Sequence, residues 1–167
     1  MIHFIGDTHF YHDAAPFFPS RNFSSLEEMH EDIITKWNSC VAKDDTIFVL
    51  GDYCFGKDYK KMVNLTEELH GRKILVKGNH DCYTPRQYQS PSCFAKYYDA
   101  PIIINGNIIL SHEPITSLSG DGLINIHAHT HGGSFLGQTK KHICVSCECT
   151  GMAPISLSEI YKRLEIH

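Results

Sequence analysis

The chain has 167 residues, of which 42% are hydrophobic and 20% are charged, and its formal net charge is −4 at pH 7. This composition excludes a disordered or low-complexity chain and predicts one globular domain over residues 1–167. Lys and Arg do not cluster and no apolar run reaches membrane-spanning length, which argues against strong nonspecific nucleic-acid binding and against a membrane partner. Because the amino terminus shows no export pattern, we expect a cytoplasmic protein.

The first half of the sequence alternates short apolar runs with helical patterns. Three runs have the length of buried strands: 2–6, 46–51 and 73–78. The helical pattern after the first run begins at Ser25, which forms a plausible capping box with Glu28. A second helical pattern ends at Gly71, a residue suited to the position after a helix. This order predicts a β-α-β-α-β unit.

The pattern changes from residue 93 onward. Asn105 and Gly106 separate two apolar runs, which is the strongest short signal for a hairpin of antiparallel strands. Two more strand-length runs follow at 123–129 and 142–147, and a capping box at Ser156 begins a final helix. We therefore expect an α/β (α+β) fold, a four-layer α/β/β/α sandwich of two mixed sheets packed face to face with helices outside. Segment 84–92 is interpreted as a loop.

Seven cysteines in a chain without an export signal favour reduced thiols over disulfides. The C-x-x-C-x-C spacing of Cys144, Cys147 and Cys149 lies in an apparent strand, and no fourth soft ligand completes a zinc ribbon. Core packing is the favoured role for these three residues, with metal binding as the alternative.

Polar clusters follow five of the apolar runs. They contain Asp7 and His9; Asp52; Asn79, His80 and Asp81; His112; and His127, His129 and His131. One such residue at a strand end is usually a turn-former, but turn chemistry does not call for histidine. The joint pattern therefore predicts a metal site at the ends of the strands.

Five segments, DTH, GDYCFG, GNHD, LSHEP and HAHTH, resemble in order and spacing the motifs of the calcineurin-like metallophosphoesterase superfamily over residues 7–131. RNFSSLEEMHEDIITKWN resembles the small, single-domain bacterial and phage-type members. The resemblance implies one metal ion held by Asp7, His9 and His131, a second held by Asn79, His112 and His129, and Asp52 bridging both. The two ions that the resemblance implies would be divalent transition metals, because mixed carboxylate and imidazole donors suit Mn, Fe, Zn, Co or Ni. We expect Mn first, with the other four metals as alternatives.

The activity implied is metal-dependent hydrolysis of phosphodiesters or small phosphomonoesters, nucleotides included, by attack of a metal-bridging hydroxide. The resemblance makes His80 the general acid, with Asp81 orienting its imidazole. A phosphoprotein phosphatase and a non-catalytic binding module on the same fold are the alternatives. GDYCFG lacks an Asp-Arg continuation and GNHD lacks a following Glu, which weakens assignment as a phosphoprotein or dinucleoside-tetraphosphate phosphatase.

The sequence says less about the roles of four further residues. Arg21 and His12 could contact a substrate phosphate, although a solvated loop is an equally good interpretation of Arg21. His127 faces the same way as His129, but the family pattern omits it, which favours a core or supporting role. Ala128 stands where the family usually has Gly, so a positive φ there would strain the loop.

Overall fold

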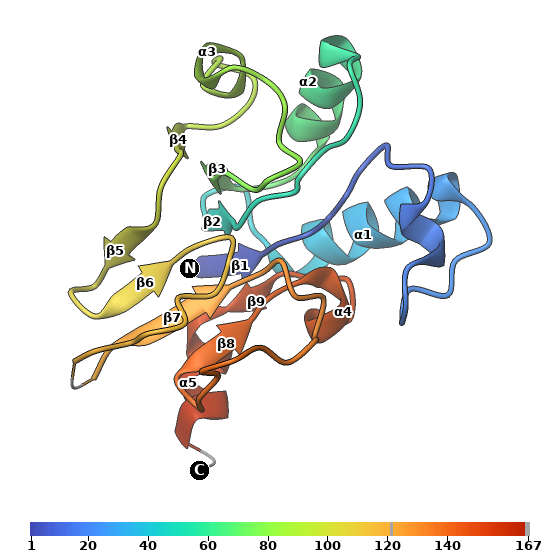
Figure 1. The fold of residues 1–167 in the computed structure, drawn as a ribbon. Coiled ribbons are helices and arrows are strands. Elements are labelled where there is room, and N and C mark those ends of the chain that lie inside the picture. Colours follow the sequence, from blue (N-terminus) through green and yellow to red (C-terminus); the bar gives the residue numbers. More distant parts are fainter. Residues whose placement is uncertain (121, 166–167) are drawn as a thin grey trace.

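The computed structural model describes residues 1–120 and 122–165, whose strands form two mixed sheets (Figure 1). The first sheet has the strand order β4-β3-β2-β1-β9, and its strands are β1 (Ile2–Ile5), β2 (Thr46–Val49), β3 (Arg72–Val76), β4 (Lys96–Tyr98) and β9 (Ile155–Ser156). The second has the order β5-β6-β7-β8, and its strands are β5 (Ile102–Ile104), β6 (Ile108–Leu110), β7 (Ile124–His127) and β8 (His142–Cys144). β1 to β4 run parallel, β6 to β8 run parallel, and only β9 and β5 are antiparallel to their neighbours.

The helices are α1 (Leu26–Cys40), α2 (Tyr59–Glu68), α3 (Pro85–Tyr88), α4 (Cys147–Thr150) and α5 (Leu157–Glu165), with a 3-10 turn η1 (Ala15–Phe17). The Ser25 hydroxyl caps α1 by accepting from the Glu28 N–H, which is one half of the predicted capping box. The Glu28 carboxylate accepts from Ser24 and not from the backbone N–H of Ser25. None of these helices, within the described residues, is long and apolar enough to cross a bilayer.

The central strands of the first sheet are buried on both faces, and alternate side chains join two different cores. In β2, Ile47 and Val49 pack with Trp37 and the other buried residues of α1 and α2. Phe48, between them, packs with residues of the second sheet, such as Leu110. The α/β sandwich of two mixed sheets is therefore confirmed, with one core under α1 and α2 and one between the sheets, which α5 joins through Ile160.

Several local predictions are confirmed and three need correction. Asn105 and Gly106 do form the turn between antiparallel β5 and β6. Strand β4 was not expected, and segment 84–92 is not simply a loop, because Thr84 and Gln87 form a capping box at the start of α3. The predicted strand 142–147 stops at Cys144, because the chain then leaves the sheet to pair Ser146 with Gly6 and enters α4.

The segment that connects β8 to α4 joins the two sheets through hydrogen bonds to Gly6. The Gly6 N–H donates to the Val145 carbonyl at 2.8 Å, and the Cys147 N–H donates to the Gly6 carbonyl at 3.0 Å. The carboxyl ends of β1, β2 and β3 therefore meet those of β6, β7 and β8. Polar residues that follow six separate strands are brought to one place, where α/β proteins commonly keep their sites.

Candidate metal centre

The turns that carry the candidate ligands share an uncommon backbone conformation. Five of the seven have a positive φ between 48° and 66°, namely Asp7, His9, Asp52, His129 and His131. Residues other than Gly rarely adopt this left-handed region, and such strain persists where the surrounding fold imposes it. Ala128 does not have a positive φ, so the strain expected there is absent.

Two glycines allow the turns after β2 and β3 to touch. A Cβ atom on Gly78 would collide with the carboxylate and backbone nitrogen of Asp52. A Cβ atom on Gly51 would lie 2.5 Å from the backbone of Gly78 and from Nδ1 of His112. Because neither glycine has a side chain, the two turns pack backbone against backbone. This close packing brings Asp52, Asn79 and His112 together.

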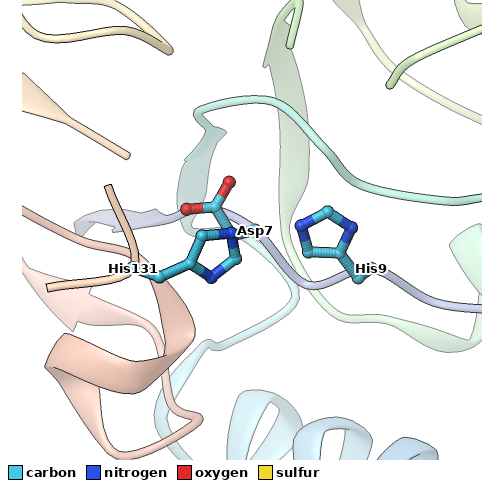
Figure 2. A group of neighbouring side chains, drawn as sticks. All are labelled: Asp7, His9 and His131. Carbon is cyan, nitrogen blue, oxygen red and sulfur yellow. The ribbon is translucent and has the colours of Figure 1, made fainter. Parts of the chain in front are cut away.

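In the first group Asp7 and His9 are buried, whereas the His131 side chain is 32% exposed. Asp7, His9 and His131 each place one ligand atom within 4.8 Å of the others (Figure 2). Asp7 Oδ1 and both ring nitrogens of His9 are buried without a hydrogen-bond partner among the described residues. Buried polar atoms are normally paired, so these atoms fit a cation that the protein would bind between them.

Electrostatics in this group keeps the His9 ring ready to bind a metal, whereas the hydrogen bond to Glu148 raises the pKa of His131. Burial, with the nearby charges of Arg21 and His131, lowers the pKa of His9 to about 2, which keeps its ring neutral. Burial raises the pKa of Asp7 to about 6. A divalent ion would reverse that shift, because it stabilises the ionised carboxylate.

The second group is more open. Asn79 Oδ1 lies 2.9 Å from His112 Nε2, and His129 Nδ1 lies 3.1 Å from each of them. His112 donates its Nδ1–H to the Leu50 carbonyl at 2.8 Å, which in the neutral ring leaves Nε2 as an acceptor. The His112–Asn79 contact therefore joins two acceptors, an arrangement that suits a shared cation.

Asp52 lies between the two groups. Its Oδ2 atom is 3.7 Å from His9 Nε2 and 3.6 Å from His112 Nε2. Its other oxygen accepts the backbone N–H of His80 at 2.9 Å. Asp52 therefore lies within reach of both groups, and the bridging role that the resemblance implies stays a prediction.

Asp81 does not orient the His80 imidazole, which corrects the sequence prediction. Its Oδ2 accepts from the N–H groups of Asp52 at 3.0 Å and Gly78 at 2.8 Å, and its Oδ1 accepts from the Tyr53 N–H at 3.0 Å. The carboxylate points into the buried turns, whereas His80 is exposed. Asp81 thus locks together the backbone turns that carry Asp52 and Asn79.

His80 stands at the rim of the centre among aromatic rings. Its ring centroid is 5.8 Å from that of His9, 6.5 Å from His12 and 5.7 Å from Phe55. The His12 ring packs on Phe55 at 4.4 Å. His12 is therefore placed beside His80, close enough to the centre to face a substrate.

The structure contradicts a substrate contact for Arg21, whose side chain is fully buried. Its Nε donates to Glu148 Oε1 at 2.6 Å, and its two terminal nitrogens donate to the carbonyls of Thr8 and Asp7. Glu148 in turn accepts the Nδ1–H of His131 at 2.9 Å. Glu148 was not among the predicted site residues, because nothing in the spacing of its cysteine-rich segment points to the centre.

His127 and the cysteines lie outside the ligand groups. The buried His127 ring packs against Phe135, with centroids 5.4 Å apart, on the outer face of the second sheet. Cys144 and Cys149 contact each other with their sulfur atoms 3.2 Å apart, and Cys147 is buried in the core. A core or supporting role thus fits His127, and core packing fits Cys147.

Comparison with known proteins gives consistent matches. A family model described as calcineurin-like phosphoesterase matches residues 1–146. Uncharacterized protein MJ1445 of Methanocaldococcus jannaschii is 34% identical over 98% of this chain and 91% of its own length. The gene 66 protein of Mycobacterium phage L5 is 28% identical over 84% of each chain. The crystal structure of AQ665, a protein of unknown function from Aquifex aeolicus, is 29% identical, with a TM-score of 0.75 over 97% of this chain and 98% of that one.

Proposed function

The chain belongs to the calcineurin-like phosphoesterase family, and we propose that it hydrolyses small phosphodiesters or phosphomonoesters, nucleotides included, with two divalent metal ions. One observation carries this proposal. On one side of Asp52, Asp7 Oδ1 and the His9 ring nitrogens are buried without a hydrogen-bond partner among the described residues, and on the other side the acceptor Asn79 Oδ1 lies 2.9 Å from His112 Nε2.

Asp7, His9 and His131 would hold one ion, Asn79, His112 and His129 the other, and Asp52 both. Oxygen and imidazole donors without thiolate suit Mn first, with Fe, Zn, Co or Ni as alternatives. When bound, such a pair supplies an activated water and neutralises phosphate oxygens during in-line attack.

His80 has the position of a general acid. It is exposed at the rim, where it can meet the oxygen of a leaving group and then exchange its proton with solvent. Its backbone N–H donates to Asp52 Oδ1 at 2.9 Å. The proton donor is thereby fixed relative to the residue that would bridge the two ions.

The surroundings favour a small ester. A groove of about 430 Å³ borders Asn79 and His112, and Lys77, Asp99 and Glu113 contribute to its walls. That volume falls within the usual range for small-molecule sites. The open rim would also admit diesters, whose second substituent can project into solvent.

A substrate panel tests the proposal directly. Cyclic nucleotides, linear diesters and monoesters would each be assayed with Mn, Ni, Co, Zn and Mg in turn. We expect turnover of bis-p-nitrophenyl phosphate with Mn, and none after a chelator. Full metal occupancy with no hydrolysis would overturn the proposed function and support a binding module, whereas a preference for phosphopeptides would indicate a phosphoprotein phosphatase.

A further inference from the structure

Behind His131 lies an ion pair that the proposed mechanism does not use. Arg21, in the loop before α1, donates to Glu148 of α4, and the two side chains are 0% and 2% exposed. They are separated by 127 positions in the chain. Burial of a charged pair contributes little net stability, because the desolvation cost offsets the attraction. The pair therefore needs another explanation.

Glu148 determines how the His131 ring is oriented. Its Oε1 accepts the Nδ1–H of His131 at 2.9 Å, which fixes the tautomer and leaves Nε2 with a free lone pair. The His131 ring stacks on His9 with centroids 5.3 Å apart, on the side of Asp7. A carboxylate that orients a metal-binding histidine in this way is a common supporting contact in metalloproteins.

Arg21 ties this contact to the other half of the centre. The same guanidinium that holds Glu148 also donates to the backbone carbonyls of Asp7 and Thr8, in the turn after β1. That turn carries two residues with positive φ, Asp7 and His9. One side chain thus holds in place the strained turn and the carboxylate behind His131.

We propose that Glu148, held by Arg21, is a positioning residue that orients His131 for the ion on the Asp7 side. This inference rests on the proposed dinuclear centre and adds a specific claim to it. Glu148 supports only one of the two ions. Loss of Glu148 should weaken the binding of that ion alone, and the Asn79 side should retain its affinity for Mn²⁺.

Binding of Mn²⁺ to the full chain tests the claim without any substrate. Equilibrium dialysis would give the two dissociation constants, and electron paramagnetic resonance would distinguish a coupled pair from an isolated ion. For Glu148→Ala we expect one dissociation constant to rise by about 10–100-fold, the cost of losing such a supporting contact. The coupled signal should give way to that of a single ion.

Two further variants separate positioning from folding. Glu148→Gln retains an oxygen acceptor for His131 and should recover affinity to within about fivefold of wild type, since only the charge is lost. The double variant Arg21→Met with Glu148→Leu removes both buried charges, so it should fold and still lose the same ion. Thr150→Val, on the same helix, removes a hydroxyl whose hydrogen bonds within the described part of the chain go to the carbonyls of Ser146 and Cys147, and it should leave both affinities unchanged.

The outcomes are distinguishable from failure of the proposed function. If the wild-type protein binds two Mn²⁺ ions but hydrolyses no ester, the proposed function is wrong. The role of Glu148 in ion binding would be unaffected by that result. If the folded Glu148→Ala and double variants keep both affinities within twofold of wild type, the inference is overturned. An equal loss at both sites would overturn it too, because a general structural defect would then explain the result.

Discussion

On one side of the candidate centre, Asp7 and His9 are buried, and His131 is held from behind by Glu148 and Arg21. On the other side, Asn79 and His129 are exposed and border open space. Closed coordination is typical of ions that remain bound, whereas an open position admits water and substrate. Under the proposed function, the Asp7 side would anchor one ion and the Asn79 side would present the other to the substrate.

The largest expected effect comes from removing the residue that the two sides share. Asp52→Ala should abolish hydrolysis and lower the affinity for both ions by at least about 100-fold, because it removes a ligand and a negative charge from each site. Equilibrium dialysis with Mn²⁺ and an assay with bis-p-nitrophenyl phosphate would measure this. The exposed Asp44→Ala variant serves as the control, and loss of only one ion would show that Asp52 does not bridge.

A smaller effect, confined to catalysis, is expected for His80, which lies at the open rim. His80→Ala should leave both ions bound and slow hydrolysis of alkyl esters by about 10²–10⁴-fold, the usual contribution of a general acid. Esters of p-nitrophenol should be affected much less, because that leaving group needs no proton. Equal losses of kcat on the two ester types would contradict the role.

Substitution of Asp81 tests whether this carboxylate holds together the backbone turns on the Asn79 side. Asp81→Ala leaves three buried backbone N–H groups without their acceptor, so the free energy of unfolding should fall by about 3 kcal/mol or more. Tyr88→Phe removes only the 3.4 Å bond from the Tyr88 hydroxyl to Asp81 and should cost less than about 1 kcal/mol. Urea titrations of both variants would measure the contrast. A similar, small loss in each would mean that Asp81 does not lock the turns.

The smallest effect, a gradual pH dependence, should appear on the buried side. Burial raises the pKa of Asp7 from 3.8 to about 6, so below that pH an ion must displace a proton from the carboxyl group. The affinity of the Asp7 side should fall about tenfold per pH unit below 6. Without an ion, this group stabilises the fold at low pH and loses that contribution as pH rises through about 6. Metal titrations between pH 5 and 8 would reveal the trend, and a flat affinity would contradict it.

The layered fold was predictable because its signals are local. Buried strands between capped helices can be recognised from apolar periodicity, and Asn105 with Gly106 marks the hairpin through turn chemistry alone. Strand β4 was missed, because Lys96, Tyr97 and Tyr98 resemble a surface segment more than a core strand. Its pairing with β3 is a tertiary contact that overrides weak local preference.

The candidate ligands could be found from their places after strands, but the residues that support them could not. By sequence, Arg21 is equally compatible with a solvated loop and with a substrate contact, and neither interpretation predicts its buried ion pair with Glu148. Glu148 reaches the centre only because the segment after β8 pairs with Gly6 and places α4 behind His131. The role of Asp81 likewise depends on three backbone donors from two different turns. Contacts between distant segments decide these roles, and no short motif encodes them.

The most direct test of the account is anomalous diffraction at the manganese edge from crystals grown with Mn²⁺. We expect two peaks, one among Asp7, His9 and His131 and one among Asn79, His112 and His129, with the Asp52 carboxylate contacting both ions. A single peak, or two peaks that Asp52 does not join, would contradict the dinuclear centre.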